Sequence, residues 1–144
     1  MEDKKLLQLV SEIGFDMLSY GGEIYRVEET VKRICFAYGM DGVDVFAIPT
    51  TIIVSITRQD ETYSRTRRLA SKGTDLDKVD RLNNLSRRLC REKPDYDLAK
   101  EWLRQIRSGL EYPLWMLCCA HGAAALIFAL FFWRQLEGWI MGFP

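Results

Sequence analysis

The stretch that decides the fold covers residues 43–57 and reads VDVFAIPTTIIVSIT. β-Branched and aromatic residues dominate it, a composition typical of strands rather than helices. Pro49 cannot donate a hydrogen bond to a neighbouring strand, so it splits the run or marks a bend or a sheet edge. Residues 58–61 have the character of a hairpin connection, and residues 62–69 then read as a polar, arginine-rich strand. We expect these strands to pair antiparallel.

Two or three strands cannot bury themselves, so helices must cover one face of the sheet. Upstream of the strands, apolar residues recur at helical steps over residues 6–18 and again along a helix at 23–38. Gly21 and Gly22 separate these helices, and Gly39 suits the C-cap of the second one. The outer side of the second helix carries two favourable pairs of opposite charge, Glu28 with Lys32 and Glu29 with Arg33.

Downstream of the strands, residues 74–91 read as a third helix, with Thr74 as its cap and acidic residues in its first turn. Pro94 breaks this helix, and Asp95 caps a short fourth helix that ends near Gly109. The core face of the third helix is expected to consist of Leu76, Val79, Leu82, Leu85 and Leu89.

The charges of the chain are strongly segregated. Charged residues make up 28% of the 144 residues, yet residues 112–133 (YPLWMLCCAHGAAALIFALFFW) contain none. A helix of this length spans about 33 Å, close to the roughly 30 Å hydrocarbon core of a bilayer, and its ends carry aromatic side chains. A buried core helix is the alternative, but a domain this small could hardly cover it on all sides. The fold class is therefore α+β: a helix-covered antiparallel sheet domain (1–110) followed by a single transmembrane α-helix (111–134).

Basic residues set the expected orientation of the transmembrane helix. Lys93, Lys100, Arg104 and Arg107 precede the apolar run, whereas only Arg134 follows it closely. The positive-inside bias places the N-terminal domain in the cytoplasm and the helix in the cytoplasmic (inner) membrane.

The first half of the apolar run is rich in small residues. Cys118 with Gly122, and Ala120 with Ala124, place small residues four apart, a spacing that lets helices approach closely in lipid. We therefore expect packing against other transmembrane helices, from a partner subunit or a homo-oligomer. His121 lies on the same stretch and serves either helix–helix hydrogen bonding and solvent contact or transport.

The sequence contains no constellation that predicts an enzyme, a metal site or a cofactor. The single histidine lies in the apolar run, and the four cysteines lack ligand spacing, so we interpret the cysteines as small apolar fillers. Residues 58–91 are basic, with ten Lys or Arg against five Asp or Glu. This stretch either faces anionic lipid or is a solvated, ion-paired surface. Nucleic acid is disfavoured because Tyr63 is its only aromatic residue and the net charge of the chain is zero.

Four segments, in their order and spacing, resemble the threonine/serine exporter family over about residues 5 to 130. They are a glycine turn with a Tyr-Arg-Val-Glu helix start (21–30, GGEIYRVEET), a Pro-Thr strand (48–56, IPTTIIVSI), an Asp-Leu…Asn-x-Leu-Ser-Arg helix (75–88), and Tyr112-Pro113-Leu114-Trp115 before an Ala/Gly-rich span. The resemblance implies a cytoplasmic domain joined to a multi-span membrane domain that exports small amino acids or related small carboxylates along an ion gradient.

The chain departs from that family pattern in two places. Residues 132–135 replace the glycines expected after the first span, and the tail at 135–144 reads as the start of a second span that is cut short. One helix cannot enclose a polar pathway, so we do not expect transport by this chain alone.

The residues of interest for substrate lie beside the glycine turn: Glu23, Tyr25, Arg26 and Glu28. These groups either bind a small carboxylate or amine substrate or tie the first two helices together. Arg87 and Arg88 are expected to serve packing or charge close to the membrane. A membrane-tethered cytosolic module that binds a ligand or lipid and acts in regulation is the alternative function, and a membrane-anchored enzyme is disfavoured by the missing base and nucleophile.

Overall fold

The computed structural model describes residues 1–70, 73–109, 118–119, 121–129 and 131–132. The chain forms two compact units, Met1–Gly109 and Leu110–Pro144. The elements of the first unit are α1 (Asp3–Ser19), α2 (Ile24–Ala37), β1 (Gly42–Ile48), β2 (Thr51–Arg58), β3 (Glu61–Arg68), α3 (Leu76–Glu92) and α4 (Tyr96–Arg107). The α+β class and the antiparallel sheet expected from the sequence are therefore confirmed.

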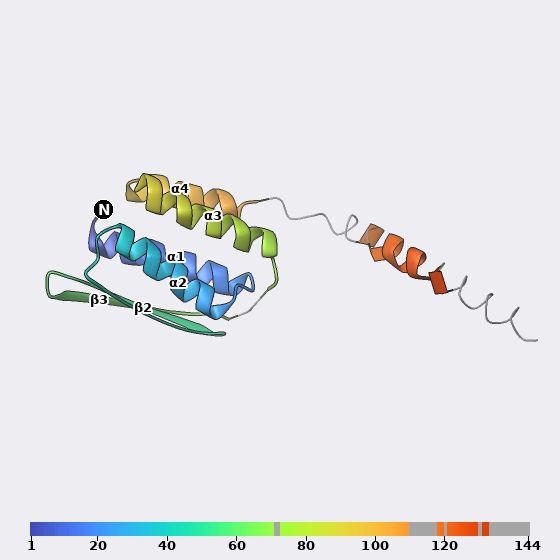
Figure 1. Cartoon of the computed structure of the whole chain (residues 1–144), viewed down its shortest axis with the longest axis horizontal. Helices are drawn as coiled ribbons and strands as arrows, with labels where there is room; N and C mark the ends of the chain where they lie inside the picture. Colours follow the sequence, from blue (N-terminus) through green and yellow to red (C-terminus); the bar gives the residue numbers. More distant parts are fainter. Residues whose placement is uncertain (71–72, 110–117, 120, 130, 133–144) are drawn as a thin grey trace, which may run out of the picture. The chain divides into compact units, whose positions relative to one another are not determined.

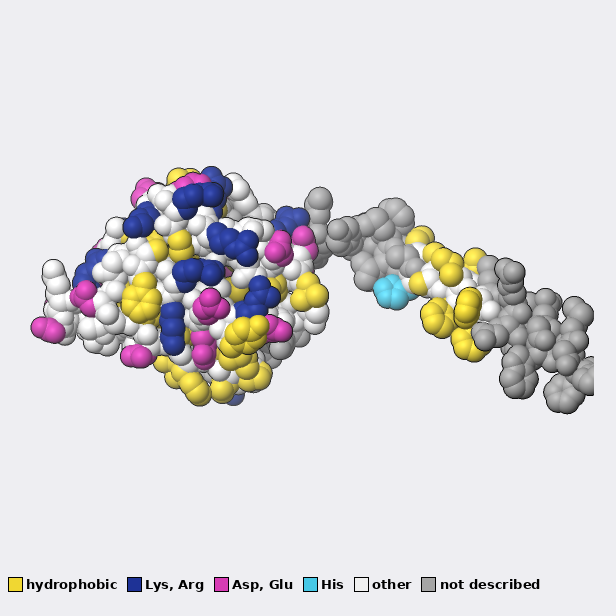
Figure 2. Space-filling model, in the orientation of Figure 1, with side chains coloured by type: hydrophobic (Ala, Val, Ile, Leu, Met, Phe, Trp, Pro, Cys, Tyr) yellow, Lys and Arg dark blue, Asp and Glu magenta, His cyan; other side chains and the backbone are white. Residues whose placement is uncertain are grey.

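The first unit consists of three layers, a sheet, then α1 with α2, then α3 with α4 (Figure 1). The three strands follow the order β1-β2-β3, and both neighbouring pairs are antiparallel. Alternation in β2 buries Ile52, Val54 and Ile56 against the helices, while the opposite face of the sheet lies open. Phe46 and Ile48 on β1 are exposed. Figure 2 shows hydrophobic side chains gathered along the lower side of the first unit, where Figure 1 draws the sheet.

Pro49 splits the apolar run, which is one of the three alternatives that the sequence left open. Ile48 pairs with Thr51, so Pro49 and Thr50 form the tip of the β1–β2 hairpin, where no ladder hydrogen bond from Pro49 is needed. The second hairpin turns at Gln59 and Asp60, which have φ values of 48° and 66°. Two positive φ values are the signature of the tight turn that matches the twist of antiparallel strands.

Helix α1 lies in the middle layer and is buried on nearly all sides. Gly14 permits this, because a Cβ at this position would lie 2.6 Å from Ile52 Cδ1 and 3.0 Å from Val31 Cγ2. The glycine therefore lets α1 approach both the sheet and α2 more closely than any other residue would allow. Two charged residues of α1 are buried as well as its apolar residues, since Glu12 and Asp16 are each only 5% exposed.

Helix α1 ends in a Schellman motif. Gly22 N–H donates to Met17 O at 2.8 Å, Gly21 N–H donates to Leu18 O at 3.1 Å, and Gly21 has a φ of 90°. The expected C-cap glycine of α2 is confirmed by the same arrangement at Gly39, with a φ of 81°.

Three local predictions were wrong. Asp75, not Thr74, caps α3, because its carboxylate accepts a hydrogen bond from Lys78 N–H at 3.0 Å. Leu76 does not join the core and is 67% exposed, since it occupies the first turn and precedes the buried face. Glu28 forms no ion pair with Lys32 among the described residues; its carboxylate turns to β1 instead.

In the second unit, the described residues between 118 and 132 are helical. Within the described part of the chain, no helix has the length and apolar character that a membrane crossing needs. The two ends of the expected span, at 111–117 and 133–134, lie outside the described residues, as does the tail at 135–144.

Candidate functional site

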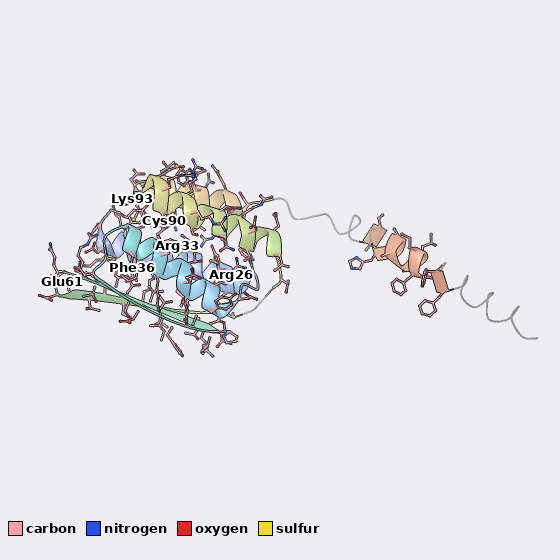
Figure 3. The ribbon with its side chains drawn as sticks, in the orientation of Figure 1. Arg26, Arg33, Phe36, Glu61, Cys90 and Lys93 are labelled. Atoms are coloured by element: carbon pink, nitrogen blue, oxygen red, sulfur yellow. The ribbon has the colours of Figure 1, made fainter. Side chains whose placement is uncertain are left out.

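The glycine turn places three of the four expected substrate residues on the surface, at the start of α2. Glu23 is the N-cap residue, although its side chain makes no capping hydrogen bond, and Tyr25 is 66% exposed. The hydrogen bond to the Glu23 carboxylate raises the pKa of the Tyr25 phenol. Arg26 is exposed on the same turn of helix (Figure 3). These three side chains form an open, polar surface rather than an enclosed cavity.

Glu28 has a structural contact. Its Oε1 accepts a hydrogen bond from the backbone N–H of Ala47 at 2.9 Å. Ala47 lies on β1, the edge strand, so this carboxylate pairs a backbone donor that no neighbouring strand can reach. Glu28 therefore fastens α2 to the sheet, which is the helix-tying role left open by the sequence.

A network of charges joins α1 to α4 on the other side of the middle layer. Lys100 Nζ lies 2.6 Å from Glu12 Oε2, and Arg107 Nη2 lies 3.2 Å from the same oxygen. Arg107 Nε also lies 2.7 Å from Asp16 Oδ2. Both carboxylate side chains are 7% exposed, whereas those of Lys100 and Arg107 are 29% and 36% exposed. The network therefore consists of buried anions held by cations that reach in from the surface.

The two carboxylates of this network respond differently to their surroundings. Burial raises the pKa of Glu12, but the hydrogen bonds from Lys100 and Gln8, together with nearby positive charge, outweigh burial and bring the pKa below its usual value. Burial dominates at Asp16 and raises its pKa, although Arg107 opposes that shift. Glu12 is paired with two cations, whereas Asp16 is paired with one, and the negative charge of Glu12 raises the pKa of Asp16 further.

Sequence reasoning missed this network. The signal was present, since Glu12 and Asp16 are spaced four apart and interrupt an otherwise apolar helix. From the sequence, Lys100 and Arg107 indicate only the orientation of the expected span. Nothing local in the sequence indicates that the fourth helix covers the first.

A shallow cleft of about 350 Å³ separates α3 from α4 on the outer layer. The guanidinium of Arg88 lies over the Trp102 ring at 3.6 Å from its centroid and pairs with Glu92 at 3.1 Å. Arg88 therefore packs the two helices together, while Arg87 is exposed. Two further arginines of the basic stretch at 58–91 form ion pairs: Arg58 with Asp3 and Arg81 with Asp77, each at 2.8 Å.

The residues expected to pack transmembrane helices lie in the second unit. Cys118, Gly122 and Ala124 are exposed there, and a Cβ at Gly122 would meet no heavy atom within 4 Å. Ala120 lies outside the described residues, and His121 is exposed. All four cysteines are free, and of these Cys35 fills the core. Among the described residues no group of three His, Cys, Asp or Glu could hold a metal ion.

Comparison with known proteins places the chain in a family of membrane transport proteins. The sequence model described as "Putative threonine/serine exporter" matches residues 8–143. The chain belongs to this family, as the four resembling segments indicated.

A curated relative, the "Probable succinate transporter subunit YjjP" of Klebsiella aerogenes, is 24% identical over 127 residues. That alignment covers 88% of this chain and 49% of the relative, so the chain spans about half the length of the curated relative it matches. No solved structure matches.

Proposed function

We propose that this chain is the N-terminal part, or a subunit, of a membrane exporter of small amino acids such as threonine and serine or of related small carboxylates. The observation that carries the proposal is the family match over residues 8–143. The name of the relative adds to this proposal a small dicarboxylate as a candidate substrate and an organisation in subunits. The family is one of transporters, which favours transport over enzyme chemistry.

The proposed arrangement is a cytoplasmic domain at 1–110 and one membrane span at 111–134 in the inner membrane, with residues 135–144 beginning a further span. The uncharged run at 112–133 and the basic residues before it support this arrangement. One span encloses no polar pathway, so transport requires further transmembrane helices beside it.

Assembly is proposed to use two faces of the span that carry small residues, one formed by Cys118 and Gly122 and the other by Ala120 and Ala124. Gly122→Leu adds a bulky side chain to the first face. Ala123→Leu is the matched control, because position 123 points about 100° away from position 122 around the helix. The experiment solubilises native membranes in detergent, isolates the full chain and measures the mass and composition of its complex. We expect a complex with multi-span partners or a homo-oligomer that Gly122→Leu disrupts and Ala123→Leu preserves. Unchanged assembly in Gly122→Leu contradicts the proposed face, and a chain absent from the membrane fraction contradicts the span.

The substrate contacts proposed at the start of α2 are Glu23, Tyr25 and Arg26, with Glu28 holding the helix in position. Export of threonine and of succinate from host cells tests them in the complete assembly. We expect Arg26→Gln to lower export several-fold, whereas Arg91→Gln, an exposed arginine at the end of α3, leaves export unchanged. Equal export by both variants at equal protein levels would remove Arg26 from the substrate path.

One observation favours a second candidate, a membrane-tethered regulatory module. Among the described residues, the first unit has a core of its own that extends from Leu6 in α1 to Leu103 in α4. Such a domain is equipped to bind a ligand by itself. A stable monomer in the detergent experiment, with no partner, would favour this candidate.

A further inference from the structure

The glycine turn at 21–22, the tip of the β1–β2 hairpin and the starts of α2 and α3 lie at one end of the first unit. Ser19 O accepts a hydrogen bond from Gly73 N–H at 2.8 Å, and Tyr20 O accepts one from Asp75 N–H at 2.9 Å. Leu69 N–H donates to Thr50 O at 2.7 Å. These bonds join the end of α1, the start of α3 and the β1–β2 hairpin tip, and Figure 1 shows the start of α2 at the same end. We call this surface the exit end.

The chain leaves the domain at the exit end. Lys100 pairs with Glu12 and Arg107 with Asp16, so α4 runs in the same direction as α1 and finishes beside the last turn of α1. Four residues, 108–111, separate α4 from the apolar run. Fully extended, they reach about 14 Å. If residues 112–133 span the bilayer, as the proposed function requires, the exit end lies within reach of the headgroup layer.

Exposed apolar side chains mark this end. Tyr25 at the start of α2 is 66% exposed, Leu76 at the start of α3 is 67% exposed, and Ile48 beside the hairpin tip is 39% exposed. Large side chains of this kind cost free energy in water, and the body of a tyrosine is suited to a membrane interface. Each of the three belongs to a different element, and none contributes to the core of the domain.

Unpaired positive charge accompanies these side chains. The guanidinium groups of Arg26 and Arg68 have no hydrogen bond or ion pair to any described residue. Three carboxylates of the described residues lie at this end: Asp75 lies 3.5 Å from Lys78 Nζ, Asp77 lies 2.8 Å from Arg81 Nε, and Glu23 accepts the hydrogen bond of the Tyr25 phenol. Arg68 also borders an open cleft of about 510 Å³ whose other lining residues are Thr50, Leu69 and Ala70. A guanidinium, a hydroxyl and apolar walls without a carboxylate suit a phosphate group.

We propose that the exit end rests on the bilayer, with Tyr25, Ile48 and Leu76 in the headgroup region and Arg26 and Arg68 on lipid phosphates. The inference rests on the proposed membrane span and extends it, because it assigns a lipid-contacting surface to the first unit. Lipid is favoured over a protein partner because the tether holds this surface near the headgroups, where apolar and cationic groups together are stabilised. Arg26 then bridges lipid and any substrate path, since it belongs to both surfaces.

Photocrosslinking of the full chain tests this proposal. The photoreactive residue p-benzoylphenylalanine replaces Tyr25 or Leu76 in the test variants and Phe36 in the control. Phe36 is 53% exposed and lies toward the other end of α2 from Arg26 (Figure 3), so the control has similar exposure without the proposed lipid contact. The variants are reconstituted in nanodiscs of equal parts phosphatidylcholine and phosphatidylglycerol, and adducts are identified by mass.

We expect lipid adducts at positions 25 and 76 to exceed those at 36 by at least tenfold, with phosphatidylglycerol adducts several-fold enriched. Arg26→Gln combined with Arg68→Gln should return the lipid ratio towards one, while Arg91→Gln at the far end leaves it unchanged. Adduct yields at 25 and 76 that equal the yield at 36, or adducts to a protein chain only, overturn the inference and leave the span intact. A chain that does not enter nanodiscs overturns the span as well, so the two failures are distinguishable.

Discussion

Replacing Glu12 with Gln removes the negative charge at the centre of the α1–α4 network while keeping the size of the side chain. The Glu12 side chain is 7% exposed, and it faces Lys100 at 2.6 Å and Arg107 at 3.2 Å. Breaking a fully buried pair costs about 3–5 kcal/mol, and breaking an exposed pair costs about 0.2–1 kcal/mol. Because the anion is buried but both cations reach water, we expect an intermediate cost of about 2 kcal/mol in the free energy of unfolding.

The measurement is urea unfolding of the full chain in detergent, followed by circular dichroism at neutral pH. Glu101→Gln is the matched control, because Glu101 pairs with Arg104 at 2.9 Å on the exposed side of α4. We expect the control to leave stability nearly unchanged. Equal losses in the two variants would refute the view that burial decides the strength of this network.

The pH dependence of the same comparison supplies a second test. The folded-state pKa of Glu12 lies below its usual value of 4.5, so its contribution to stability is present above that value. The contribution is lost as the pH falls through the folded-state pKa. The difference between wild type and Glu12→Gln should therefore be largest near neutral pH and shrink in acid. A difference that stays constant down to acid pH contradicts this assignment.

Three further outcomes are expected. Gly14→Ala should destabilise the domain by about 1–3 kcal/mol in urea unfolding, because the new methyl group meets Ile52; a neutral result would mean that Ile52 can move aside. Gln59→Gly should stabilise it by about 0.5–1 kcal/mol, since glycine adopts the φ of 48° without steric cost; a loss would show that the Gln59 side chain matters more than its backbone. Burial raises the pKa of the Cys35 thiol to about 12, so iodoacetamide at pH 8 should label Cys35 only after unfolding, as mass analysis of its peptide can verify; labelling of the folded chain would contradict its burial.

Local signals were sufficient to predict the elements of the first unit. Pro49 indicated a break, a bend or a sheet edge because a residue without an N–H cannot lie inside a ladder, and the structure selects the break. Gly39 marked a helix end because its backbone adopts a φ of 81°. The β-branched composition of residues 43–57 indicated strands, and β1 and β2 occupy most of that run. These features depend on a few consecutive residues, so the sequence carries them directly.

Contacts between distant segments were not predictable in this way. The pairs between Glu12 and Arg107 and between Glu28 and Ala47 join residues 95 and 19 positions apart. Helical periodicity shows which face of α4 is apolar but not which helix it covers. The candidate substrate residues stay a prediction, and the structure adds only their surroundings at the start of α2. Their exposure, and the backbone contact that distinguishes Glu28 from the others, required the three-dimensional arrangement.

The position of α4 over α1 has a consequence for biosynthesis. During translation, α1 is made first, but the cations that neutralise Glu12 and Asp16 are made last, at positions 100 and 107. Until then, an apolar helix with two unpaired carboxylates has no complete binding partner, and closure must wait for a contact of very high sequence separation. The apolar run follows within a few residues of Arg107. If that run spans the bilayer as proposed, completion of the domain and membrane insertion of the run would take place almost at the same time, so each event could influence the other.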